Sequence, residues 1–236
     1  MASGSQRLDR YLSRTLGINR RDVKPLLAQG RVQVDGRSVG GTDHLIDEFS
    51  HVSIDDRLLQ AKLPVYLMFH KPVGILSATS DPQHTTVIDM LQRPDKDDLH
   101  IVGRLDRGSS GLLLLTNDGR WSRALMAPEH AVPKVYLVTL QNPLTSDYVK
   151  AFAEGMYFDY EDIITRPARL EILEERLARV TLVEGRYHQI KRMFGRFRNP
   201  VLALHRTAIG NLPLDPALTP GQSRELTPVE LTGIQG

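Results

Sequence analysis

A carboxylate stands in an unusual position in the segment GRLDRGSSGLLLL, which covers residues 103–115. Asp106 lies between two arginines, three residues before Ser-Ser-Gly and six before four consecutive leucines. An aspartate in front of Ser-Ser-Gly is most often a turn residue. It can also be half of a salt bridge, and a carboxylate beside a buried strand can act as a nucleophile or a base. These residues alone leave all three roles open.

The composition excludes several kinds of chemistry. The 236 residues contain no cysteine, which excludes disulfides, thiolate zinc sites and a thiol nucleophile. The eight histidines form no HExxH pair, and no nucleotide-binding loop is present, so we expect neither a metal site nor a cofactor. The polar start, MASG, looks like a disordered leader, and no apolar run is long enough to span a membrane. We expect a cytoplasmic protein.

Positive charge is concentrated in two segments although the net charge is only +2. Residues 7–37 hold eight Lys or Arg against three Asp, and residues 184–206 hold six against one Glu. Clusters of this kind are typical of proteins that bind a polyanion. Solvated helix faces are the alternative explanation.

The N-terminal part predicts two short helices followed by a hairpin. RLDRYLSRTLG (7–17) places its apolar residues at helical spacing and ends on glycine. Asn19 can cap a second helix that runs to Gly30, although Pro25 removes an amide donor within it. In RVQVDGRSV (31–39) the valines flank an Asp-Gly pair, which is typical of a hairpin turn.

A polar junction, RLLQAKLP (57–64), separates this part from a larger one, so we expect domains of residues 6–58 and 64–236. Strand patterns outnumber helical ones in the larger part and do not alternate regularly with them. This predicts an α+β domain with a mixed, mainly antiparallel sheet and flanking helices. The expected strands are 65–71, 100–105, 111–116, 134–140, 168–173, 178–185 and 200–210, and the expected helices are 119–126, 146–156 and 187–197.

Two short basic helices followed by a hairpin resemble the S4 RNA-binding domain. In that family the second helix and the turn after it lie on RNA. The resemblance implies RNA contacts for the residues at the matching positions, which are Asn19, Arg20, Arg21, Lys24 and Arg31.

The segment GRLDRGSSGLLLLTNDG (103–119) resembles the signature of the RsuA/RluB/E/F family of pseudouridine synthases. FHKPVG (69–74), KVYLV (134–138) and EGRYHQIKRM (184–193) resemble three further motifs of that family, in the same order. With the S4-like part, the resemblance covers nearly the whole chain. One departure is Ser109, where the family usually has threonine. The resemblance implies an enzyme that isomerises uridine in RNA.

The resemblance also implies roles for single residues. Asp106 would be the catalytic carboxylate and Lys191 the cation that offsets its burial, whereas Tyr136 would stack on the uracil and assist proton removal from C5. Arg104 would fill the space of a flipped-out uridine. Without the resemblance, Lys191 reads as solvent-exposed, Tyr136 as a core residue and Arg104 as half of a salt bridge. Further residues expected to contact RNA or support the site are Lys71, Arg186, Tyr187, His188, Arg192 and Arg196.

The predicted substrate is 16S rRNA, because no basic tail follows LTPVELTGIQG; 23S rRNA is the alternative. A non-catalytic ribosome-assembly factor is a second possibility. A glycoside hydrolase would need a second acid near Asp106, and Asp118 is better placed to cap a helix. We expect a monomer that binds rRNA, free or in a ribonucleoprotein particle, and no membrane. Attack by Asp106 at C1′, attack at C6 and abstraction of a sugar proton all remain open.

Overall fold

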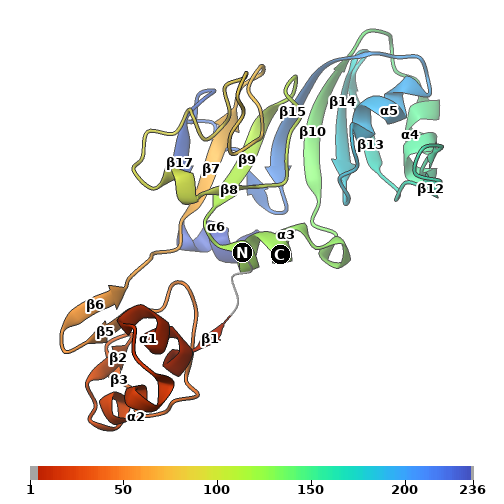
Figure 1. Cartoon of the computed structure of the whole chain (residues 1–236). Helices are drawn as coiled ribbons and strands as arrows, with labels where there is room; N and C mark the ends of the chain where they lie inside the picture. Colours follow the sequence, from red (N-terminus) through yellow and green to blue (C-terminus); the bar gives the residue numbers. More distant parts are fainter. Residues whose placement is uncertain (1–4, 235–236) are drawn as a thin grey trace. The chain divides into compact units, whose positions relative to one another are not determined.

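The computed structural model describes residues 5–234, and the predicted leader lies outside them. The chain divides into two units (Figure 1). The first holds residues 5–64 together with Asp118–Arg120, and the second holds Val65–Asn117 and residues 121–234. Nowhere in residues 5–234 is a helix long and apolar enough to cross a bilayer.

The first unit contains the two predicted helices and the predicted hairpin. Gly17 ends the first helix in a left-handed conformation, and Asp35 and Gly36 both have positive φ in the hairpin turn, as an Asp-Gly turn requires. Pro25 lies inside the second helix. The elements are β1 (Gln6–Arg7), α1 (Leu8–Leu16), α2 (Arg20–Ala28), β2 (Val32–Val34), β3 (Arg37–Ser38), β4 (Leu45–Ile46), β5 (Val52–Ile54) and β6 (Arg57–Gln60).

Four of these strands form an antiparallel sheet in the order β3-β2-β5-β6. Buried residues of α1 and α2, such as Leu12 and Leu27, share one core with Val32 and Val52 of this sheet. The unit extends past the predicted end at residue 58, because β6 pairs with β5 through Gln60.

The second unit is built on one large sheet with the order β13-β14-β10-β15-β9-β7-β17, while β8 pairs with β9 and β16 with β15. All its ladders are antiparallel except that between β9 and β15, which confirms the mixed, mainly antiparallel α+β fold. Its strands are β7 (Tyr66–Lys71), β8 (His100–Val102), β9 (Ser110–Thr116), β10 (Lys134–Leu140), β13 (Arg169–Glu174), β14 (Leu177–Leu182), β15 (Val201–Ile209), β16 (Leu212–Pro213) and β17 (Ser223–Glu225), and a small ladder joins β11 (Tyr157–Phe158) to β12 (Ile163–Ile164).

The four consecutive leucines of β9 are buried on both faces of the sheet. Leu113 and Leu115 belong to one core, whereas Leu112 and Leu114 belong to the other. Side chains alternate across a strand, so a run without polar residues marks a strand covered on both sides. This central position fixes the end of β9 next to the Asp106 loop.

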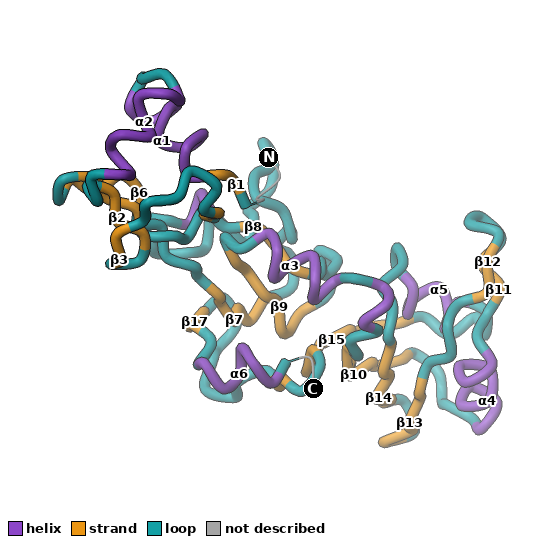
Figure 2. The backbone as a smooth tube through the Cα atoms, turned by 90° about the horizontal axis from the view of Figure 1, so that it is seen from below, coloured by secondary structure: helices purple, strands orange, loops and turns teal. Residues whose placement is uncertain are grey.

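Helices cover different parts of the sheet (Figure 2). The ribbon and tube views place α4 (Ser146–Glu154) and α5 (Gln189–Gly195) beside the β13–β14 end, where Phe152 and Phe194 pack into the first core. Leu125 of α3 (Gly119–Met126) packs into the second core, and α6 (Pro228–Gly233) lies near β7. As predicted, Asp118 caps α3, since its carboxylate accepts a 2.9 Å hydrogen bond from the amide of Arg120.

Candidate active site

Asp106 lies in the loop between β8 and β9, where three contacts fix the backbone. The Asp106 carbonyl accepts a 3.0 Å hydrogen bond from the Ser109 amide, which closes a turn. Ser77 Oγ donates to the Leu105 carbonyl at 2.7 Å, and the Gly74 amide donates to the Arg107 carbonyl at 2.8 Å. The residue is therefore a turn former through its backbone, which leaves its side chain available for other interactions.

The Asp106 carboxylate is half-buried and faces two basic side chains. Oδ2 lies 3.2 Å from Lys191 Nζ, and Oδ1 lies 3.5 Å from His188 Nε2. The Asp106 side chain is 29% exposed and that of Lys191 is 35% exposed. The carboxylate is therefore more accessible to solvent than the sequence predicted. The predicted ion pair between these residues is present in the structure.

A cavity of about 730 Å³ surrounds the carboxylate. It is large enough for a nucleoside, because ligand pockets of some 300–1,000 Å³ accommodate small molecules. Seven residues to which the sequence analysis assigned a role line it, namely Arg104, Asp106, Tyr136, Arg186, Tyr187, His188 and Lys191.

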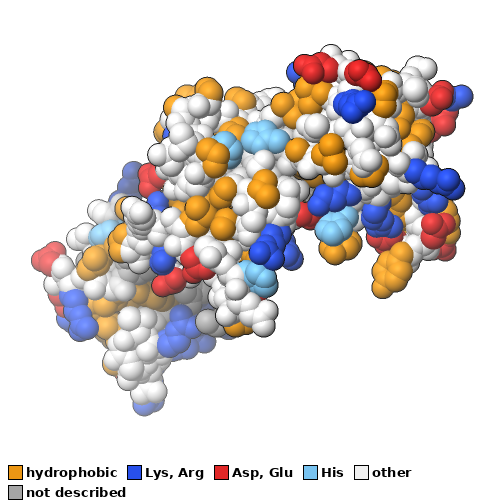
Figure 3. All heavy atoms as spheres, turned by 90° about the horizontal axis from the view of Figure 1, so that it is seen from above, with side chains coloured by type: hydrophobic (Ala, Val, Ile, Leu, Met, Phe, Trp, Pro, Cys, Tyr) orange, Lys and Arg blue, Asp and Glu red, His pale blue; other side chains and the backbone are white. Residues whose placement is uncertain are grey.

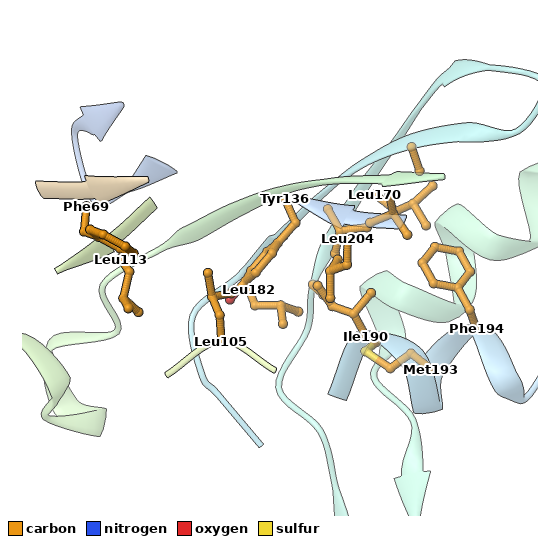
Figure 4. Packing of buried hydrophobic residues seen from close by; sticks show 14 of the residues in the cluster. Phe69, Leu105, Leu113, Tyr136, Leu170, Leu182, Ile190, Met193, Phe194 and Leu204 are labelled. Carbon is orange, nitrogen blue, oxygen red and sulfur yellow. The ribbon is translucent and has the colours of Figure 1, made fainter. Parts of the chain in front are cut away.

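Tyr136 forms part of the inner wall of the cavity. It is buried, and its side chain points from β10 toward Leu105 and Leu182 (Figure 4). Its register partner on β15 is Arg206, whose guanidinium carbon lies 6.0 Å from the centre of the tyrosine ring. Tyr136 thus packs in the core and also faces the cavity. Its interpretation as a core residue and its interpretation as a residue that contacts the uracil are therefore compatible.

The model of the RNA pseudouridylate synthase family matches residues 65–195, which include Asp106, Tyr136 and Lys191. A ribosomal small subunit pseudouridine synthase A from Pseudomonas aeruginosa is 51% identical over 97% of this chain and its own full length. The protein of that name from Escherichia coli K12 is 40% identical over 97% of this chain and 99% of its own. The chain belongs to the pseudouridine synthase family.

A solved structure described as a pseudouridylate synthase supports the same conclusion for the fold. It is 36% identical, covers 98% of this chain and all of its own, and superposes with a TM-score of 0.71. The predicted family and enzyme class are thereby confirmed.

Arg104 of the synthase is exposed at the cavity and makes no ion pair with any residue in the described range. The salt-bridge alternative is therefore wrong for this residue. Lys71 requires a different correction, because its side chain is fully buried. Its ammonium donates to the Ser109 carbonyl at 2.8 Å and to the Pro72 carbonyl at 3.0 Å, so it holds the Asp106 loop and does not face RNA.

The third motif of the synthase folds into a hydrogen-bonded loop ahead of α5. The Arg186 guanidinium donates to Glu184 at 3.1 Å, and the Arg186 amide donates to the side chain of Gln189 at 3.0 Å. His188 adopts a left-handed conformation just before the helix, and its ring stacks on the exposed Tyr187 at 3.9 Å. This loop brings His188 to Asp106 and Lys191.

Arg192 and Arg196 are not part of this cavity. Arg192 forms two 2.6 Å hydrogen bonds with Glu161 and lies over the ring of Phe158, and Arg196 pairs with Asp159. The predicted basic face of α5 is therefore largely neutralised by the loop between β11 and β12. Figure 3 shows basic and acidic side chains interspersed on the right-hand part of the face it presents.

The basic residues of the first unit differ in how closely they are paired with acidic side chains. Arg20 donates to the buried Asp9 at 2.6 Å, and Arg31 pairs with Asp55. Although burial raises the pKa of Asp9, hydrogen bonds from its arginine partners outweigh burial and lower the pKa to about 2. Arg21 and Lys24 are exposed on α2, and only Arg21 has an acidic neighbour, at 3.9 Å. Asn19 precedes α2 as predicted, but its side chain makes no cap hydrogen bond.

Sequence reasoning missed two buried cations that line the cavity, Lys134 and Arg206. Both are buried, at 7% and 1% exposure. A signal was present for Lys134, because alternation along KVYLVTL places it on the same face as Tyr136. The spacing of residues gave no such signal for Arg206. Within residues 5–234, no three His, Cys, Asp or Glu side chains are grouped so that they could hold a metal ion.

Replacing Lys191 should impair the reaction without unfolding the protein. Lys191→Met removes the cation at 3.2 Å from Asp106 and leaves a half-buried carboxylate poorly compensated. We expect the single-turnover rate of pseudouridine formation to fall roughly tenfold to a hundredfold, because the pair is partly solvated. Lys191→Arg keeps the charge and should recover most of the rate. A wild-type rate for Lys191→Met would contradict this role.

Proposed function

We propose that this synthase converts one uridine of the small-subunit, 16S, rRNA into pseudouridine. The observation that carries the proposal is the alignment with enzymes named for the small subunit. It extends over 97% of the chain and therefore includes the first unit as well as the catalytic one. An assembly factor without activity would not need the cavity, the ion pair and Tyr136 together.

In this proposal the S4-like first unit binds RNA, and the second unit performs the reaction. Among the five residues at the positions that match the S4 domain, Arg21 and Lys24 carry the charges least compensated by acidic neighbours, whereas Arg20 and Arg31 form close ion pairs and Asn19 is uncharged. RNA phosphates would compete with Asp9 and Asp55 for Arg20 and Arg31. The strongest electrostatic contribution is therefore expected from Arg21 and Lys24.

The proposed reaction breaks the N1–C1′ bond of the uridine, turns the base and joins C5 to C1′, while a proton moves from C5 to N1. Asp106 acts as nucleophile or base on the nucleoside, and Lys191 orients its carboxylate through the 3.2 Å ion pair. Tyr136 supports the uracil face. Arg104, exposed and unpaired among described residues, enters the stack that the uridine leaves, which offsets part of the few kcal/mol that base flipping costs.

The proposed partner is rRNA, either free or assembled with ribosomal proteins, and the enzyme would act as a monomer in the cytoplasm. No cofactor or metal enters the proposed reaction, because isomerisation changes neither the oxidation state nor the set of atoms.

Release of tritium from C5 of labelled uridine tests the proposal. The purified protein would be incubated with 16S rRNA, 23S rRNA and partly assembled small-subunit particles, each labelled at C5. Release from 16S rRNA or its particles, at a single site, is expected. Release from 23S rRNA alone would overturn the 16S assignment. Pseudouridine mapping in a strain that lacks the gene should show one 16S position unmodified.

Salt dependence of binding tests the role of the first unit. Arg21→Ala with Lys24→Ala should weaken RNA binding and reduce the slope of log K against log salt by about 1.4–1.8, since each lost phosphate contact accounts for some 0.7–0.9. Lys150→Ala serves as the control, because Lys150 is an exposed lysine of α4 in the other unit. An unchanged slope in the double variant would show that neither side chain touches phosphate.

A further inference from the structure

Two buried cations face the cavity beside Tyr136. Lys134 and Arg206 line it, and both side chains lie on the face of the sheet that carries the tyrosine. Lys134 is two residues before Tyr136 on β10, and Arg206 is the register partner of Tyr136 on β15. Cations this deeply buried are rare unless they are paired, because desolvation of a charge is costly.

Neither cation has a carboxylate partner within residues 5–234. The Lys134 ammonium donates to the carbonyl of Val132 at 3.0 Å. The Arg206 guanidinium donates through Nε to the Leu112 carbonyl and through Nη2 to the Gly103 carbonyl, both at 2.7 Å. Lys134 therefore keeps two N–H donors, and Arg206 keeps three, two on Nη1 and one on Nη2.

The two charges also repel each other. Burial lowers the pKa of Lys134, and the nearby Arg206 lowers it further. An anion bound next to both side chains would replace lost hydration and relieve this repulsion. The two side chains are thus arranged to bind an anion, and no described carboxylate of the protein occupies that position.

The proposed reaction generates such a charge. When the N1–C1′ bond breaks, its electron pair leaves with the base, and the negative charge is shared by N1, O2 and O4. Attack at C6 would likewise place charge on O4. We propose that Lys134 and Arg206 form the binding site for this anionic base and stabilise it through hydrogen bonds from their free donors. The inference rests on the proposed function of Tyr136 as the support of the uracil.

The position of the cations favours the base over a backbone phosphate. Residues at the exposed part of the cavity, such as Arg104 and Tyr187, are accessible to an RNA chain. Lys134 and Arg206 are almost inaccessible, and only the part of a nucleotide that enters the cavity could approach them. Preorganised donors in such a site act most strongly on charge that develops in the transition state.

Comparison of uridine with 5-fluorouridine in the same RNA tests the inference. Fluorine withdraws electrons and makes the base a better anion, so the enzyme has less charge to stabilise. Lys134→Met should lower the single-turnover loss of uridine by about 10²–10³-fold, as expected for removal of one such donor. The defect with 5-fluorouridine should be at least tenfold smaller, and the Kd for RNA should be unchanged. Mass spectrometry of nuclease digests follows both bases, at slightly acidic pH so that N3 stays protonated.

Arg179→Met is the matched control. Arg179 lies on the neighbouring strand β14, exposed on the opposite face of the sheet, so the variant loses the same charge far from the cavity. It should behave like the wild type with both bases. Lys134→Gln provides a second, polar replacement if Lys134→Met does not fold.

Three results would overturn the inference: a wild-type rate in both Lys134 variants, the same defect with both bases, or a defect that arises from weaker RNA binding, as a phosphate contact predicts. The comparison uses whichever rRNA the wild type modifies. Failure of the 16S assignment would therefore leave this test intact, and failure of this test would not affect that assignment.

Discussion

Asp106→Asn is expected to reduce the rate of pseudouridine formation by about 10³–10⁴-fold, at the upper end of what a single acid–base or nucleophilic group contributes. Asparagine has nearly the same size, so the turn closed by the Ser109 amide should persist. The amide is neither charged nor nucleophilic, and it cannot form the ion pair with Lys191. RNA binding should change little, because the substitution removes no positive charge that RNA phosphates could contact. Single-turnover tritium release and filter binding measure the two quantities.

Asp147→Asn is the control, since Asp147 is an exposed carboxylate in the first turn of α4 in the same unit. It should keep the wild-type rate. Tritium release by Asp106→Asn at a rate close to that of the wild type would remove Asp106 from the mechanism.

Gly111→Ala should destabilise the synthase by about 3–5 kcal/mol, in the range of severe single substitutions. Gly111 has φ of 110°, a conformation that L side chains rarely adopt. An added Cβ would lie 2.2 Å from the carbonyl oxygen of Arg206 and 2.6 Å from its amide nitrogen. These are backbone atoms of β15 at the only parallel ladder among the described strands. Moving them away from the added Cβ would disrupt the hydrogen bonds between β9 and β15. Urea unfolding measures the loss.

Gly108→Ala is the matched control in the same loop, because a Cβ there meets no atom within 4 Å. It should change the free energy of unfolding by less than about 0.5 kcal/mol. An equally small effect of Gly111→Ala would contradict the close packing of β9 against β15 at Gly111. A folded Gly111→Ala protein should also have lower activity, since Arg206 belongs to the strand that must shift.

The sequence by itself determined the family, the class of fold and the position of Asp106. The catalytic motifs are continuous in the chain, and their order was enough to indicate the enzyme. Local patterns predicted the elements well where the physical cause is local. Gly17 stops α1, the Asp-Gly pair turns the hairpin, and the leucines of β9 fill a strand buried on both faces.

Only the tertiary structure decided which basic side chains are paired with acidic residues and which are buried. Helical spacing shows that Arg192 lies on a polar face, but its partner Glu161 is 31 residues away and depends on how β11 and β12 fold. For the same reason the burial of Lys71 could not be predicted from FHKPVG.

Arg206 shows most clearly that the surroundings of a side chain depend on the tertiary structure. It reads as one more residue of a basic segment, yet the pairing of β15 with both β10 and β9 buries it behind the cavity. A sequence pattern fixes which face of a strand a side chain occupies. Whether that face meets solvent, a carboxylate or a substrate depends on strand neighbours that are distant in the chain, and these are chosen by the packing of the whole domain.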